Sequence, residues 1–276
     1  AAISVTLTAL SYAELSAMFP RAGAEYIYLT NAFPKHHWIG SSVGLAMAFS
    51  GAATAAAVSI AFSGYLEQLV SITPIFISLL LLVFFTYLSI MGIQASVWAN
   101  VLFTLIEVVG LCLIIYLGLR SDTFGDALTS VPHLGTLSGA ALVVFSFFGF
   151  ENTVNLSDET KNPTRDIPRA ILISLAISSV LYILVSLSAI SLVEPNLLAQ
   201  SDAPLMLVAQ TASSKFGMIL GIVALFSTAN TALLSMIGAS RILFGMAKSN
   251  ALPKALIHIL PIRKTPWVAS LTILAL

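Results

Sequence analysis

A glycine and a carboxylate lie inside one of the long apolar runs of this sequence, in the stretch FSFFGFENT that begins at Phe145. Gly149 has a low helix propensity, and Glu151 follows it before the apolar run has ended. If the helix breaks around Phe147–Phe150, its backbone amides and carbonyls become free to bind a polar ligand. Irregular backbone of this kind is tolerated at membrane depth only where it lines a cavity or is buried in protein.

A break here would place Glu151 near the N-terminus of the second half-helix, where the helix dipole favours negative charge. Discontinuous helices form the substrate sites of secondary transporters. We therefore predict a substrate-binding or gating site that consists of Phe145, Phe147, Phe148, Gly149, Phe150 and Glu151. The alternative is a kinked but continuous helix in which Glu151 caps the chain or extends toward a loop.

A polar stripe on the apolar run Val97–Leu119 is a second candidate site. Asn100, Thr104 and Glu107 recur at intervals of four and three residues, which places them on one face of a helix. No basic residue in the same run can pair with Glu107. Because an unpaired charge at this depth is costly, the carboxylate should be protonated or bound to a cation, and we predict a role in ion coupling. The alternative is a neutral Glu107 that is hydrogen-bonded to a neighbouring helix.

A third candidate is the stretch FSTANTALLS, which begins at Phe226. Ser227, Thr231 and Ser235 form a stripe at intervals of four residues, with Thr228 beside it. Oxygen atoms of this kind suit a small cation such as Na⁺, so Ser227, Thr228 and Thr231 join the predicted ion-coupling residues. The same groups could instead hydrogen-bond between helices.

The composition of the whole chain is that of an integral membrane protein. Hydrophobic residues make up 58% of its 276 residues and charged residues 9%, against roughly 25% charged in a soluble domain. The net charge is zero, which gives no basis for nucleic-acid binding. The single cysteine, Cys112, excludes an internal disulfide and a multi-cysteine metal site. No nucleophile–base pair, P-loop or HExxH motif is recognisable, so we predict a protein that is not an enzyme and has no cofactor.

Apolar runs of about 20 residues, enough to cross a hydrocarbon core of about 30 Å, recur along the chain. We expect an all-α integral membrane protein with a single transmembrane domain over residues 1–276, truncated at both ends. The expected spans are residues 1–19, 39–65, 72–91, 97–119, 137–156, 170–193, 216–246 and 268–276. Between Glu194 and Lys215 the chain is too polar to span, which predicts short amphipathic helices at one face of the bundle.

If the predicted spans cross the membrane in alternating directions, the loops fall into two sets, one on each side. The basic residues are distributed very unequally between these two sets. Of the twelve Lys and Arg residues, only Arg120 and Lys215 fall in one set. The other set holds Arg21, Lys35, Lys161, Arg165, Arg169, Arg241, Lys248, Lys254, Arg263 and Lys264. Because cytoplasmic loops carry the excess of Lys and Arg, we expect the larger set to be cytoplasmic.

Three motifs, in this order and spacing, resemble those of the amino acid–polyamine–organocation (APC) superfamily of permeases. The run ALSYAELSAMFPRAGAEYIYL, Ala9–Leu29, is similar to their second helix and the loop after it. The run FSFFGFENTVNLSDETKNPTRDIPRAI, Phe145–Ile171, resembles their broken sixth helix and the following cytoplasmic loop. The run ASRILFGMAKSNALPKAL, Ala239–Leu256, with RKTPWVA after it, resembles the end of the eighth helix and the start of the ninth.

The resemblance implies a leucine-transporter-type fold of two inverted five-helix repeats, of which this chain is a fragment from the second to the early ninth membrane helix. It also implies that the other broken helix of the family, the first, lies outside this sequence. By the same resemblance Phe145 matches an aromatic gate, the carbonyls around Phe145 and Phe148 match acceptors for the substrate amino group, and Glu151 matches an acidic position after the break. Several proton-coupled relatives have a lysine where this sequence has Glu107, so H⁺ and Na⁺ both stay open as the coupling ion.

We therefore expect a plasma-membrane permease for amino acids that works by alternating access, through H⁺- or Na⁺-coupled symport or through exchange. The alternative from another class is a membrane sensor that binds an amino acid without net transport. A channel is a third class, and the four phenylalanines at the break argue against an open pore. The expected partners are a small amino acid and the lipid bilayer, with no nucleic acid, and the oligomeric state is open.

Overall fold

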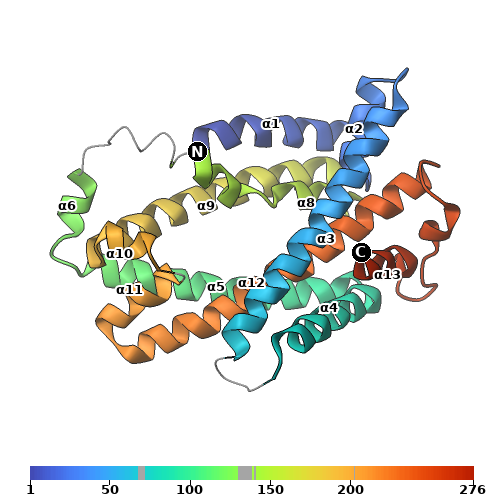
Figure 1. The fold of residues 1–276 in the computed structure, drawn as a ribbon. Coiled ribbons are helices and arrows are strands. Elements are labelled where there is room, and N and C mark those ends of the chain that lie inside the picture. Colours follow the sequence, from blue (N-terminus) through green and yellow to red (C-terminus); the bar gives the residue numbers. More distant parts are fainter. Residues whose placement is uncertain (68–71, 130–138, 140, 202) are drawn as a thin grey trace.

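The computed structural model describes residues 1–67, 72–129, 139, 141–201 and 203–276 (Figure 1). The regular secondary structure of these residues is entirely helical. In this part of the chain, five helices are long and apolar enough to cross a membrane: α3 (His37–Glu67), α4 (Pro74–Met91), α5 (Ile93–Leu119), α9 (Pro163–Leu192) and α12 (Ser214–Lys248). The chain is thus an all-α, multi-pass membrane protein, as its composition predicts.

Shorter helices connect and flank these spans. They are α1 (Ala2–Met18), α2 (Ala24–Ala32), α6 (Phe124–Thr129), α8 (Phe150–Val154), α10 (Pro195–Ala199), α11 (Pro204–Ala212) and α13 (Trp267–Ala275), with 3-10 turns η1 (Val144–Phe147), η2 (Ser157–Glu159) and η3 (Lys254–Ile257). α10 and α11 occupy the polar segment in which short helices are predicted. α2 is an addition to the predicted elements, and it begins after Gly23, whose φ of +76° is left-handed.

α3, α5, α9 and α12 begin before the predicted spans, whereas α1 and α4 lie within theirs. α9 begins at Pro163, seven residues before the start of the predicted span at Ala170. Proline suits the first turn of a helix, and the polar residues after Pro163 form turns that precede the apolar part of the same helix. The start of the predicted span 137–156 falls partly outside the described residues, at 137, 138 and 140.

α12 crosses the centre of the molecule and packs against α3, α4, α5, α11 and α13 (Figure 1). It is the most buried of the five spans. Small residues of α3 permit the close approach: a Cβ atom on Gly51 would lie 2.9 Å from the Cβ of Ala239 and 3.2 Å from the backbone oxygen of Ser235. Lipid gives no hydrophobic drive for helix association, so close contact between small residues is what brings such helices together.

A second layer of the bundle consists of α1 and α9, which run side by side (Figure 1). Their buried residues form one apolar cluster with Phe147 of η1 and Val154 of α8. α8 contacts α1, α9 and also α12. The segment η1–α8 therefore lies between the layer of α1 and α9 and the layer that contains α3 and α12.

Candidate functional site

The apolar run that contains Glu151 is broken at Phe148 and Gly149. η1 ends at Phe147, and Phe148 is extended with φ −68° and ψ 147°. Gly149 then has φ +129°, and α8 begins at Phe150. Side-chain-bearing residues rarely adopt this φ, so the conformation requires glycine. A Cβ atom at Gly149 would meet no other atom within 4 Å, so backbone conformation rather than crowding selects the glycine, and the predicted break is confirmed.

Glu151 lies in the first turn of α8 and folds back onto the break. Its Oε2 atom accepts a hydrogen bond of 2.7 Å from the backbone nitrogen of Gly149. The carboxylate thus satisfies an amide that the broken helix cannot pair internally. This bond holds a negative charge directly beside the irregular backbone.

A cavity of about 470 Å³ lies between α3, the broken segment and α12. Its lining residues come from three places: Met47, Ser50, Gly51 and Thr54 on α3, Phe145, Phe148, Gly149, Glu151 and Asn152 at the break, and Thr231, Leu234, Ser235 and Ile242 on α12. The volume is within the range of small-molecule sites, about 300–1,000 Å³. Aromatic rings, hydroxyls and one carboxylate together suit a small molecule with a cationic group and an apolar part.

The four phenylalanines of the break point in different directions. Phe145 is 67% exposed, and its ring contacts that of Phe148 edge to face at 5.4 Å between centroids. Phe147 is 9% exposed and packs on Tyr182 of α9 at 4.9 Å, while Phe150 packs on Tyr12 of α1. Of the six predicted residues, Phe147 and Phe150 therefore do not line the cavity.

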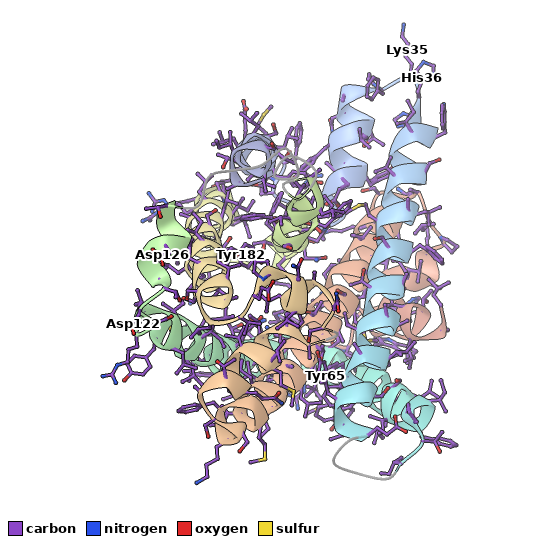
Figure 2. The ribbon with its side chains drawn as sticks, turned by 60° about the vertical axis from the view of Figure 1, so that its left-hand side comes forward. Lys35, His36, Tyr65, Asp122, Asp126 and Tyr182 are labelled. Carbon is purple, nitrogen blue, oxygen red and sulfur yellow. The ribbon has the colours of Figure 1, made fainter. Side chains whose placement is uncertain are left out.

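Phe147 and Phe150 face a second cavity of about 240 Å³, on the α9 side of the break. Tyr182, whose place in the bundle is marked in Figure 2, also lines it. The hydroxyl of Tyr182 donates a hydrogen bond of 2.6 Å to the backbone oxygen of Ser146. α9 thus pairs one of the carbonyls at the break and supports the conformation of the broken segment.

The two polar stripes that were predicted separately meet across the contact between α5 and α12. The side-chain nitrogen of Asn100 donates to Asn230 at 2.8 Å, and that of Asn230 donates to Thr104 at 3.2 Å. The hydroxyl of Ser227 donates to Oε1 of Glu107 at 2.9 Å. Asn100, Thr104, Glu107 and Ser227 therefore belong to one hydrogen-bonded interface.

The remaining two predicted ion-coupling residues lie elsewhere on α12. The hydroxyl of Thr228 donates to the backbone oxygen of Ala224 at 2.9 Å, within its own helix. Thr231 lines the cavity at the break instead. In the described part of the chain, no group of three or more His, Cys, Asp or Glu side chains is placed to hold a metal ion.

Sequence reasoning missed a buried polar cluster that follows α8. Oδ1 of Asn155 accepts hydrogen bonds of 3.0 Å from the backbone nitrogens of Gly23 and Ala24. Its side-chain nitrogen donates to Oε2 of Glu25 at 3.2 Å. The stretch FPRAG before Glu25 could have indicated this cluster. It predicts a turn, and the buried backbone amides of a turn require hydrogen-bond acceptors from elsewhere in the chain.

Glu25 is 5% exposed, and its Oε1 atom has no hydrogen-bond partner among the described residues. Burial raises the pKa of Glu25 above its ordinary value, and the nearby charge of Glu151 acts in the same direction. Hydrogen bonds from its own backbone and from Asn155 act in the opposite direction. A carboxyl group whose pKa is raised by burial therefore lies one side chain away from the segment after the break.

Two ion pairs join the turn η2 to the C-terminal part of α12. Nε of the buried Arg241 lies 2.8 Å from Oε1 of Glu159, and Nζ of the exposed Lys248 lies 2.9 Å from Oδ2 of Asp158. Asp158 also accepts a bond of 3.3 Å from the backbone nitrogen of Ala22. These contacts and Asn155 anchor the chain after the broken helix to the end of the bundle that carries the basic loops.

Comparison with known proteins identifies relatives over the whole chain. A family model described as "Amino acid permease" matches residues 1–276. The branched-chain amino acid permease BcaP of Bacillus subtilis (strain 168) is 26% identical over 302 residues, which cover 98% of this chain and 63% of that protein.

Two eukaryotic transporters match this chain with a similar sequence identity. Cationic amino acid transporter 4, vacuolar, of Arabidopsis thaliana is 29% identical over 306 residues, which cover 99% of this chain and 50% of that protein. Cationic amino acid transporter 4 of Homo sapiens is 28% identical over 303 residues, which cover 98% of this chain and 46% of that protein. The chain thus spans 63% or less of the length of each of these three relatives.

Proposed function

Because the chain belongs to the amino acid permease family, we propose that it carries the substrate site of a secondary transporter that moves amino acids by alternating access. The observation that supports this most directly is the break at Phe148 and Gly149, which faces a cavity of about 470 Å³. Broken helices beside a cavity are where secondary transporters bind their substrates. The relatives carry the names of permeases and transporters rather than of enzymes.

In this proposal the amino group of the substrate lies near Glu151 and the backbone carbonyls of the break. The carbonyl of Phe145 accepts a bond of 3.2 Å from the amide of Phe148, and its second lone pair can accept another. The rings of Phe145 and Phe148 cover the apolar part of the substrate and act as a gate. The apolar lining favours a neutral amino acid.

Transport would be driven by H⁺ or Na⁺, or would be exchange of one amino acid for another. Glu107 is the candidate for the coupling charge, because its hydrogen-bond donor among the described residues is the neutral hydroxyl of Ser227. Asn100, Thr104 and Ser227 would support it from the same two helices. We place the protein in the plasma membrane, with the end of α12 that holds Arg241 and Lys248 on the cytoplasmic side.

Uptake by the intact parent protein in proteoliposomes tests this proposal. Labelled leucine, isoleucine, alanine, lysine and arginine are supplied under an imposed H⁺ gradient, under a Na⁺ gradient, or under neither. We expect accumulation under one gradient, which identifies the ion and the substrate together. Exchange would appear as uptake only into vesicles that already contain amino acid.

A membrane sensor that binds an amino acid without moving it is the second candidate. The buried cluster of Asn155, Glu25 and the ion pair of Arg241 with Glu159 favours it, since this cluster ties the broken segment rigidly to α2 and α12. Saturable binding of an amino acid without accumulation under any gradient or exchange condition would overturn the transporter proposal and support the sensor.

A further inference from the structure

A separate cavity of about 280 Å³ lies at the other end of α12 from Arg241 and Lys248. It lies between α5, α11, the first half of α12 and the end of α3, where Tyr65 is found (Figure 2). None of the residues that line it also lines the cavity at the broken helix. This cavity is therefore distinct from the proposed substrate site.

One carboxylate, Glu107, lies in the wall of this cavity. Among the described residues the ion pairs are Arg241 with Glu159 and Lys248 with Asp158, and Glu107 has no cationic partner. Ser227 donates to Oε1 of Glu107, and no described group donates to its Oε2. Glu107 is partly buried, and a carboxylate beside an apolar wall attracts a cation more strongly than one that is fully solvated.

The rest of the wall is mostly apolar and includes Leu111, Leu205, Met206, Leu220 and Val223. The volume is many times the ~30 Å³ that a water molecule takes up in the liquid, so an inorganic ion would fill only a small part of it. A molecule that carries both a cationic head and an alkyl chain matches the carboxylate and the apolar wall together.

We propose that this cavity is a second binding site, which takes a primary alkylammonium ion. The ammonium group binds Glu107, and the chain lies against Leu205, Met206 and Leu220. An amine bound there would compete with any inorganic cation at the same carboxylate. The proposal does not depend on transport, because binding is measured directly.

The test is thermal unfolding of the intact parent protein in detergent, with n-pentylammonium chloride as the probe. A ligand that binds the folded protein raises the Tm in a concentration-dependent way. NaCl at equal ionic strength and neutral n-pentanol serve as parallel probes. We expect a saturable rise in Tm with n-pentylammonium and a much smaller one with n-pentanol, since n-pentanol lacks the charge.

The first variant is Glu107→Gln, which keeps the shape of the side chain and removes its charge. Because a charged partner in a hydrogen bond strengthens binding considerably, the affinity for n-pentylammonium should fall about tenfold or more. Glu194→Gln, which changes an exposed carboxylate outside the cavity, is the matched control and should leave the affinity unchanged.

A second variant blocks the cavity and leaves the carboxylate in place. Gly221 lines the cavity, and a Cβ atom there would meet no other atom within 4 Å. Gly221→Leu therefore places a side chain in the cavity with no clash at its Cβ atom and improves helix propensity, so the variant should fold. It should abolish the response to n-pentylammonium, whereas Gly125→Leu, at an open glycine outside the cavity, should not.

Three results would overturn the proposal. One is an affinity for n-pentylammonium that neither Glu107→Gln nor Gly221→Leu reduces. Another is a response to n-pentanol as large as that to the amine. The third is a rise in Tm with NaCl that depends on Glu107 while n-pentylammonium has no effect, which would assign the carboxylate to an inorganic cation.

Discussion

Asn155 and Glu25 are joined by a hydrogen bond of 3.2 Å between the side-chain nitrogen of the first and Oε2 of the second. Asn155 directly follows α8, and Glu25 lies in the first turn of α2. The oxygen of the same Asn155 side chain binds the amides of Gly23 and Ala24. One buried side chain thus connects the end of the broken helix to the start of α2.

Asn155→Ala should lower the free energy of unfolding by about 2–4 kcal/mol, because it removes the acceptor of two backbone amides and one donor to the buried carboxyl group of Glu25. The measurement is Tm and denaturant unfolding of the purified protein in detergent. Asn196→Ala is the control, since Asn196 is exposed and its side chain donates a hydrogen bond to the nearby, exposed Glu194. Equal stabilities of the two variants would contradict the structural role of Asn155.

Titration of Glu25 should contribute to the pH dependence of the stability of the protein. Burial raises its pKa in the folded protein above the ordinary 4.5, so the folded state binds the proton more tightly than the unfolded state. The stability of the wild type is therefore fully present below the ordinary pKa and declines as the pH rises through the raised pKa. Glu25→Gln lacks this titration, so its Tm relative to the wild type should increase as the pH rises above the ordinary pKa of 4.5.

Glu14→Gln, at an exposed position of α1, is the control for Glu25→Gln and should follow the wild-type profile. If the profiles of Glu25→Gln and the wild type run parallel over the whole range, Glu25 does not titrate differently in the two states.

Phe145→Ala should affect substrate binding and Phe147→Ala should affect stability, although the two residues are only two positions apart. Phe145 is largely exposed at the cavity, so its loss should raise the KM for the substrate about tenfold with little change in Tm. Phe147 is buried against Tyr182, so its loss should cost about 3–5 kcal/mol of stability. Uptake kinetics and Tm of both variants check this, and an unchanged KM for Phe145→Ala would exclude Phe145 from the gate.

Gly149→Ala should impair the protein through backbone strain, because φ +129° is unfavourable for alanine. We expect a loss of about 1–3 kcal/mol in stability or a rearranged break with reduced substrate binding. Gly125→Ala offers the same substitution in open space without a left-handed φ, and it should be neutral. Wild-type stability and binding in Gly149→Ala would show that the break does not depend on this conformation.

The two ion pairs near α12 should differ in their contribution to stability. Arg241 is buried and also donates to Ser89 and Ser240, so Arg241→Gln should cost about 3–5 kcal/mol by leaving Glu159 without its cation. The pair of Lys248 with Asp158 is solvent-exposed on the lysine side, so Lys248→Gln should cost about 0–1 kcal/mol. Denaturant unfolding of both variants tests the order, and the reverse order would contradict it.

The sequence by itself determined the class of the protein and the position of the break. Apolar runs of membrane length can satisfy their backbone only as helices within a bilayer, so composition alone predicts an all-α membrane protein. Gly149 marks the break because the positive φ at this point requires glycine. Glu151 marks the restart of the helix because a carboxylate is favourable in a first turn.

Only the tertiary structure decided which helix faces contact one another. Ser227 and Thr231 lie one turn apart on α12, yet Ser227 donates to Glu107 while Thr231 lines the cavity at the break. Helical periodicity defines the directions of side chains relative to one another. The rotation of the whole helix depends on its packing against other helices, and lipid gives no hydrophobic preference that a sequence could reveal. The bond between Asn155 and Glu25 joins residues 130 positions apart, so it exists only once the bundle has brought α2 and α8 together.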